Sequence, residues 1–163
     1  MRLARYFFIA SLICYVILVG YAAAMLADVE GIAEWMKEQR EADDGEVSGG
    51  EAIGIAALII LVVVYLVIYL IVTAIPLILK VVNAILANVV LGIICTVTDA
   101  FVATAHAILT VATVAGSAVS GPVPIWMIIS TVLSIVSLVF TVLGTSRRRA
   151  VFKAMQQTKE ANV

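Results

Sequence analysis

Two ionisable side chains lie inside one of the most apolar parts of this sequence. Asp99 and His106, which is the only histidine, stand in the stretch CTVTDAFVATAHA at residues 95–107. Acids and histidines within membrane segments are rare, and they mark ion pathways, proton relays or buried polar contacts. A separation of seven residues places the two backbones about 10 Å apart along a helix. We therefore expect no direct contact between them, and any link requires another side chain or water.

Small and polar residues accompany this pair along one side of a predicted helix. This stripe steps by three or four residues through Thr96, Asp99, Ala103, His106, Thr110, Thr113 and Ser117. A second stripe with the same spacing comprises Ser130, Ser134, Ser137, Thr141 and Gly144. A third comprises Tyr65, Tyr69, Thr73 and Pro76. Because lipid cannot satisfy polar groups, we expect all three stripes to face the interior of a helix bundle.

These stripes define two sets of candidate residues. The candidate polar site inside the membrane consists of Asp99, His106, Thr96, Thr110, Tyr65 and Tyr69. The candidate helix-packing seam consists of Ser130, Ser134, Ser137 and Gly144. Small residues let two helix backbones approach closely, so we expect this seam to pack on the third span or on an identical subunit. The polar site is either an ion or proton pathway, or a set of hydrogen bonds that fixes which helix faces pack.

Composition places the chain in a membrane. Of its 163 residues, 64% are hydrophobic and 13% are charged, whereas a soluble domain is about half apolar and about a quarter charged. A membrane-spanning helix needs about 20 apolar residues, so this length accommodates four spans with short connections. We therefore predict an all-α fold, a single integral membrane domain over residues 1–163 built as a four-helix bundle.

The charges are strongly segregated along the chain. Nine of the eleven acids fall within residues 27–52, where the only bases are Lys37 and Arg40. The other bases lie at the start, at Lys80, and in the tail that begins with Arg147. Lys and Arg mark the cytoplasmic side of membrane proteins. This pattern predicts that the N and C termini are both cytoplasmic and that the acidic loop at 27–52 is extracytoplasmic.

The expected spans follow from the apolar runs between these charges. They cover about residues 6–26, 54–75, 86–115 and 125–144, followed by a basic cytoplasmic tail at 145–163. The first run is longer than the apolar core of a signal peptide, so we expect a retained helix. Pro76 can end a helix, and together with Lys80 it predicts a cytoplasmic hairpin near 76–84. A five-span alternative divides residues 81–120 into two short helices.

The acidic loop contains one ordered element. Val29, Ile32, Ala33 and Met36 recur at the spacing of a short helix with one apolar face. Such a helix can lie on the outer membrane surface, with Trp35 at the depth of the lipid headgroups. A role of the acids in attracting cations to a pore is the alternative to an ordinary solvated loop.

No catalytic motif accompanies the membrane segments. The sequence lacks HExxH, GxSxG, GxGxxG, P-loop and CxxC patterns, and one histidine does not build a usual metal site. We expect no enzyme activity, no cofactor, no metal and no nucleic-acid partner. The triplet Arg147, Arg148 and Arg149 suits contact with anionic lipid headgroups. The expected partners are the lipid bilayer and copies of the chain or other subunits of a membrane complex, with the plasma membrane as the location.

The overall plan resembles that of the MARVEL-domain tetraspan proteins. The resemblance rests on the RLAR start that runs into the first span, the Tyr-rich second span that ends in proline, TDAF in the third and SRRR after the fourth. It implies a role in membrane organisation or trafficking, and no functional residue carries over. The long acidic first loop departs from that family. We therefore expect a non-enzymatic protein that organises membrane or assembles with itself or other subunits, with an ion- or proton-conducting component as the alternative.

Overall fold

The described part of the chain folds into five helices. The computed structural model describes residues 2–44, 49–116 and 122–160, with side chains described at 2–38, 56, 57, 59–112 and 125–160. The helices are α1 (Arg2–Ala27), α2 (Val29–Asp44), α3 (Gly49–Leu86), α4 (Val89–Gly116) and α5 (Pro122–Glu160). The described residues contain no strand. The all-α prediction is therefore confirmed.

Four of these helices contain segments that are long and apolar enough to cross a membrane. These segments are Arg2–Ala27, Ile59–Leu86, Val89–Ala112 and Ile125–Glu160. The third is a single continuous helix, because α4 runs unbroken from Val89 to Gly116. The chain is thus an integral membrane four-helix bundle, and the five-span division of residues 81–120 is wrong.

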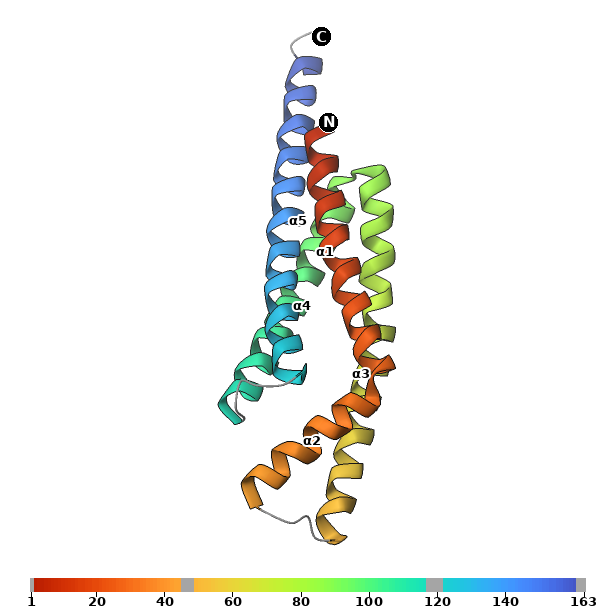
Figure 1. The fold of residues 1–163 in the computed structure, drawn as a ribbon. Coiled ribbons are helices and arrows are strands. Elements are labelled where there is room, and N and C mark those ends of the chain that lie inside the picture. The colour runs from red at the N-terminus through yellow and green to blue at the C-terminus, as the bar shows by residue number, and fades with distance from the viewer. Residues whose placement is uncertain (1, 45–48, 117–121, 161–163) are drawn as a thin grey trace.

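The helices form an elongated bundle with distinct ends. Figure 1 shows the N terminus, the C-terminal part of α5 and the α3–α4 turn toward one end, with α2 and the start of α3 at the other. Helix α5 packs extensively on both α1 and α4, and α1 also packs on α3. Helices α3 and α4 make far fewer contacts with each other. They separate below their shared turn, as Figure 1 shows.

The second span is longer than the sequence indicated. Helix α3 continues through Pro76 and Lys80 to Leu86, so the hairpin predicted at 76–84 and the end of the span at residue 75 are wrong. Proline removes one backbone donor, but membrane helices tolerate this where hydroxyl groups and neighbouring helices satisfy the backbone. Pro76 leaves the carbonyl of Val72, four positions earlier, without its helical donor, and the helix nevertheless continues on both sides of the proline.

The turn between α3 and α4 lies at Ala87 and Asn88. Ala87 has a left-handed backbone with φ of 47°, and its N–H donates to the Asn83 carbonyl at 2.7 Å. This is a typical helix C-terminal arrangement. The side-chain oxygen of Asn88 then accepts from the Val90 N–H at 2.8 Å, which caps the start of α4. The chain therefore reverses within two residues.

Helix α2 is the short helix expected in the acidic loop. Its apolar face packs against the end of the bundle, because Ile32 is 1% exposed and lies in a cluster with Ala22, Leu66 and Trp126. The expectation that this face lies on the membrane surface is wrong for Ile32. The acids of α2 remain at the end of the molecule opposite the termini (Figure 1).

The basic tail is also helical. Helix α5 extends from Pro122 to Glu160 without interruption, so residues 145–160 continue the fourth span, and the C-terminal part of α5 projects beyond the other helices (Figure 1). Most of its side chains are exposed, including Phe152 and Met155. The helix therefore continues past residue 144, where the sequence predicted that the span ends.

Candidate functional site

A buried ion pair lies inside the bundle. Lys80 of α3 and Asp99 of α4 approach to 2.6 Å between Nζ and Oδ2, and their side chains are 3% and 1% exposed. The long lysine stem reaches from its own helix to a carboxylate on the next one. Residues that the sequence assigned to a cytoplasmic hairpin and to an intramembrane polar stripe therefore meet as partners.

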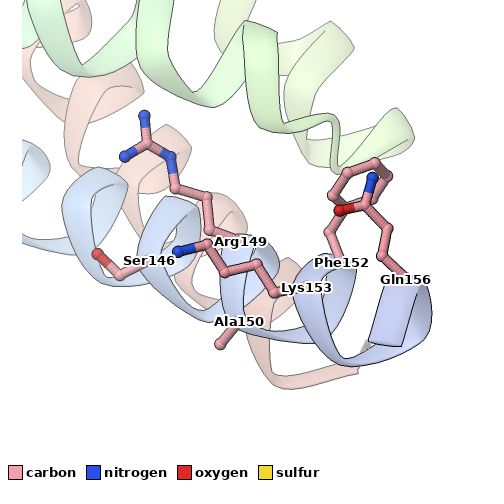
Figure 2. A pocket seen from close by; sticks show the side chains of 6 residues that line it. All are labelled: Ser146, Arg149, Ala150, Phe152, Lys153 and Gln156. Carbon is pink, nitrogen blue, oxygen red and sulfur yellow. The ribbon is translucent and has the colours of Figure 1, made fainter. Parts of the chain in front are cut away.

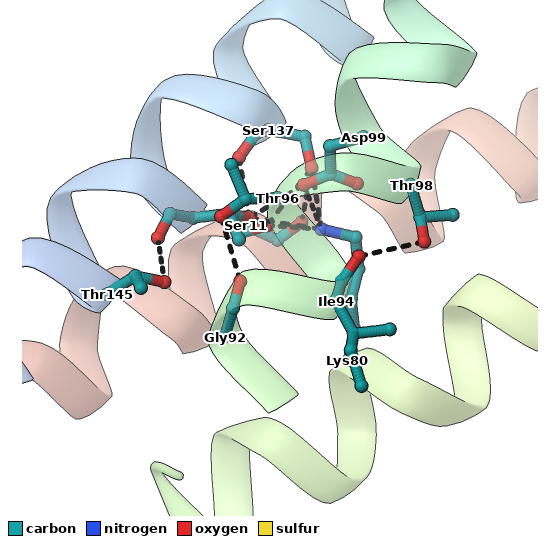
Figure 3. Close-up of polar contacts among 10 residues, drawn as sticks. Ser11, Lys80, Gly92, Ile94, Thr96, Thr98, Asp99, Ser137 and Thr145 are labelled. Carbon is teal, nitrogen blue, oxygen red and sulfur yellow. Dashed lines mark hydrogen bonds and ion pairs between the residues drawn. The ribbon is translucent and has the colours of Figure 1, made fainter. Parts of the chain in front are cut away.

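Hydroxyl groups from the other two spans surround this pair. The Lys80 ammonium group lies 2.6 Å from Ser11 Oγ of α1, and 3.0 and 3.2 Å from the hydroxyls of Ser137 and Thr141 of α5. Thr141 also donates to Asp99 Oδ2 at 2.7 Å. Figure 3 shows these contacts converging on the lysine nitrogen. We call Ser11, Lys80, Asp99, Ser137 and Thr141 the ion-pair cluster.

The ion-pair cluster meets most of the requirements for a charged pair in an apolar interior. Desolvating two charges costs several kcal/mol per ion, and only good geometry with additional hydrogen bonds offsets that cost. The three ammonium protons of Lys80 have four oxygen atoms within reach, and the Tyr15 ring lies 5.2 Å from Nζ, within cation–π distance. In the described part of the chain, Asp99 Oδ1 is buried without a hydrogen-bond partner.

His106 belongs to a separate group of rings. Its imidazole packs edge-on against Tyr69 at 5.4 Å between centroids, and Tyr69 packs on Trp126 at 5.9 Å. Tyr65 contacts both Tyr69 and Trp126 at 6.2 Å. We call Tyr65, Tyr69, His106 and Trp126 the aromatic cluster. His106 is 2% exposed, and neither ring nitrogen has a hydrogen-bond partner among the described residues.

The structure divides the predicted polar site into separate environments. Asp99 lies in the ion-pair cluster, whereas His106, Tyr65 and Tyr69 lie in the aromatic cluster. Thr96 donates to the Gly92 carbonyl of its own helix at 2.8 Å. Thr110 donates to the Met127 carbonyl of α5 at 2.9 Å and lies 2.7 Å from the Thr131 hydroxyl. The Thr113 side chain and Ser117 lie outside the described residues.

Sequence reasoning missed two members of the ion-pair cluster. Lys80 was assigned to a loop, and Ser11 stands in a span where no polar stripe was noticed. One signal in the sequence indicates the pair: two consecutive spans, which run antiparallel, carry one base and one acid. With the turn at residues 87 and 88, Lys80 and Asp99 are 7 and 11 residues from it, a difference of about 6 Å of helix rise. A lysine stem extends across a distance of that size.

The seam residues of α5 are all inside the bundle. Ser130, Ser134 and Ser137 are 1%, 2% and 1% exposed, and Ser137 contacts Ser11 of α1 at 3.0 Å between the hydroxyl oxygens. Gly144 faces the Phe8 ring of α1. Ser137 and Gly144 thus pack on α1, whereas the sequence predicted the third span or an identical subunit as the partner of the seam.

The three arginines after the fourth span are not equivalent. Arg148 donates from Nε to the Ala87 carbonyl at 2.8 Å, which joins α5 to the α3–α4 turn, whereas Arg147 and Arg149 are exposed. A shallow surface hollow of about 610 Å³ runs along this part of α5, lined by residues that include Arg149, Phe152 and Lys153. Figure 2 shows these side chains and the Arg149 guanidinium extended from the helix.

Among the described residues, no group of three His, Cys, Asp or Glu side chains has an arrangement that could hold a metal ion. Comparisons with protein-family models, curated proteins and solved structures give no match for this chain. The resemblance to MARVEL-domain proteins therefore rests on the sequence plan alone.

Proposed function

We propose that this chain is a non-enzymatic four-span membrane protein that organises membrane or assembles with itself or with other subunits. The ion-pair cluster is the observation that carries this proposal. One residue or more from each of the four spans contributes to it, since Ser11, Lys80 and Asp99 come from α1, α3 and α4 and Thr141 comes from α5. Among the described residues, the Lys and Asp side chains buried in the spans are Lys80 and Asp99, and this pair holds the bundle together.

A conducting pathway would need these charges to separate and hydrate. Removing one partner of a buried pair costs about 3–5 kcal/mol, and the Lys80 ammonium group already has a partner for each proton. The aromatic cluster contains no acid that would take over from Asp99. The polar interior is therefore better suited to a fixed arrangement of helices than to transport.

The outer surface of α1 supports assembly. Gly20 and Ala24 are both exposed, and a Cβ atom built on Gly20 would have nothing within 4 Å. A small-xxx-small pair on a lipid-facing surface lets a second helix approach closely, which is how membrane helices associate in the absence of a hydrophobic driving force. We assign the contact between subunits to this face of α1, because the seam of α5 is occupied within the bundle.

The orientation follows from charge. Arg2, Arg5 and the five bases from Arg147 to Lys159 lie at the end that holds both termini, whereas α2 and its acids lie at the other end. The preference of Lys and Arg for the cytoplasmic side puts both termini in the cytoplasm. The plasma membrane remains our predicted location, and fractionation of cells that express a tagged chain tests it.

Reconstitution in liposomes tests the proposed function. Purified protein is placed in vesicles that contain a pH-sensitive dye, and a proton gradient and a membrane potential are imposed in turn. We expect vesicles that contain the wild type or Asp99→Asn to leak protons no faster than vesicles without protein. A flux that the wild type supports and Asp99→Asn abolishes would refute the proposal.

That outcome would favour the second candidate function, an ion- or proton-conducting component. Its specific support is the pair of unsatisfied groups on α4, because Asp99 Oδ1 and both ring nitrogens of His106 are buried without partners among the described residues. His106→Leu would then reduce the flux as well. Under the proposed structural role, His106→Leu leaves the vesicle leak unchanged.

A further inference from the structure

A cleft opens between α3 and α4 where the two helices separate. Its volume is about 300 Å³, at the lower end of the range of small-molecule sites. Its lining is almost entirely apolar, with His106, Tyr65 and Tyr69 as the polar side chains at one end. The ion-pair cluster contributes no residue to this lining, so the cleft is a separate feature of the bundle.

The polar end of the cleft has unused hydrogen-bonding capacity. The hydroxyl of Tyr69 and both ring nitrogens of His106 are buried without a hydrogen bond of good geometry among the described residues, although the imidazole lies near the Val102 carbonyl of its own helix. A buried polar group without a hydrogen bond costs about 1–3 kcal/mol, and such groups are uncommon in native proteins. His106 of α4 and Tyr69 of α3 line the same cavity. Such an arrangement is expected where a bound molecule supplies the missing hydrogen bonds.

The two threonines that line the rest of the cleft already have hydrogen-bond partners. The Thr73 hydroxyl donates to the Tyr69 carbonyl at 2.7 Å, and the Thr98 hydroxyl donates to the Ile94 carbonyl at 2.9 Å. The mouth is formed by the large exposed side chains Val72, Ile75 and Phe101. On a membrane-spanning helix these side chains face lipid, so the cleft is entered from the hydrocarbon region.

The depth of the polar end indicates how a bound molecule is oriented. His106 follows Val89 by 17 residues, which is about 25 Å of helix rise from the end that holds the α3–α4 turn. The polar end is therefore in the half of the bundle nearer the acidic helix α2, and the apolar lining extends from there toward the middle of the membrane. A molecule with one polar group at its end and an apolar body fits this gradient.

We propose that the α3–α4 cleft binds a membrane-dissolved apolar molecule with a single terminal hydroxyl or carbonyl group, which hydrogen-bonds to His106 and Tyr69. A hydroxyl group donates to an imidazole nitrogen and accepts from the tyrosine. A carbonyl group only accepts, from the Tyr69 hydroxyl or from a protonated imidazole nitrogen. An ordinary lipid acyl chain supplies neither group and leaves both side chains unsatisfied.

Photolabelling in nanodiscs tests this binding site. The probe is hexadecanol with a diazirine in its chain, applied to the purified full-length protein, and the labelled peptides are mapped by mass spectrometry. We expect labelling of residues 98–109 and 65–79, the stretches that line the cleft. Unlabelled hexadecanol and the methyl ketone of the same chain length should displace the probe at least tenfold better than hexadecane, and their relative potency tells a hydroxyl from a carbonyl preference.

Three variants and one control complete the experiment. Tyr69→Phe and His106→Leu each remove hydrogen-bonding groups, and we expect labelling to fall about fivefold. Ala105→Phe fills the cleft with a ring and should abolish labelling. Thr104→Val, on an exposed face of α4 outside the cleft, should have no effect. Unfolding midpoints identify any variant that fails to fold, and Tyr69→Phe, which deletes one unpaired hydroxyl, should remain folded.

Two outcomes would overturn the proposal. Displacement by hexadecane as effective as displacement by hexadecanol would mean that an acyl chain of the bulk lipid fills the cleft. Labelling that Ala105→Phe leaves unchanged would mean that the probe binds elsewhere on the surface.

Discussion

Gly144 of α5 lies directly against the ring of Phe8 of α1. A Cβ atom built on Gly144 would be 2.7 Å from Phe8 Cε1, well inside van der Waals contact. The two helices therefore approach as closely as a glycine allows, one turn from Thr141 of the ion-pair cluster. The same close approach brings Ser11 and Thr141 to 2.7 Å between their hydroxyl oxygens. Small residues and polar contacts thus act together along the α1–α5 contact.

We expect Gly144→Leu to destabilise the bundle by about 3 kcal/mol, the upper part of the range for overpacked interiors. The added side chain forces α1 and α5 apart and weakens the contacts of the ion-pair cluster. The measurement is reversible unfolding in mixed micelles. Gly20→Leu is the matched control, because Gly20 faces open space and its replacement should change the free energy of unfolding of the monomer by less than about 0.5 kcal/mol. Equal losses in the two variants would contradict the assigned contact.

Gly20→Leu has a different expected effect on self-association. It removes the small surface that we assign to the contact between subunits, so the dimer fraction measured by crosslinking or by energy transfer in liposomes should fall about tenfold. Val132→Leu, on an exposed face of α5, should leave that fraction unchanged. A dimer that tolerates Gly20→Leu would place the contact on another face.

Arg148→Ala should destabilise the bundle by about 1–2 kcal/mol, because the variant loses the charged hydrogen bond to the Ala87 carbonyl at the α3–α4 turn. Arg147→Ala, a change of the same kind at an exposed neighbour, should be silent within about 0.5 kcal/mol. Denaturation in detergent without anionic lipid separates this effect from headgroup binding. The hydrogen bond would have no role in stability if both variants unfold alike.

Labelling of single cysteines tests the topology. In a chain with Cys14 and Cys95 replaced by alanine, Glu38→Cys and Thr158→Cys each introduce one thiol at an exposed position. A membrane-impermeant maleimide added to intact cells should label position 38, and position 158 only after permeabilisation. Labelling of both positions from outside would contradict the orientation.

The sequence predicted the helices better than it predicted their partners. The number of spans, the interior position of Asp99 and His106 and the short helix in the acidic loop all follow from hydrophobic periodicity, which reports one helix at a time. Lys80 was misplaced because proline and a base usually indicate a helix end in water-exposed sequence, whereas a membrane bundle can bury both. Pairing between helices depends on the register of the turn, and Ala87 gives no glycine or proline signal for it.

The division between the two clusters could not be predicted either. Asp99 and His106 share one face of α4, but they lie about two turns apart, and different neighbouring helices cover that face at the two heights. The ion-pair cluster receives Ser11 from α1, and the aromatic cluster receives Tyr69 from α3. Which neighbour covers which turn of a helix is set by the crossing of the helices, and that information is absent from the spacing of residues along one chain.

A double-mutant cycle at Lys80 and Asp99 tests the central claim, that this pair holds the four spans together. Free energies of unfolding are measured in mixed micelles for the wild type, Lys80→Met, Asp99→Leu and the double variant. Each single change leaves a buried charge without its partner, and we expect it to cost about 3–5 kcal/mol, whereas replacement of both residues by apolar ones of similar volume should cost much less than either. A double variant that loses the sum of the two single losses would show that the residues act independently and would contradict this account.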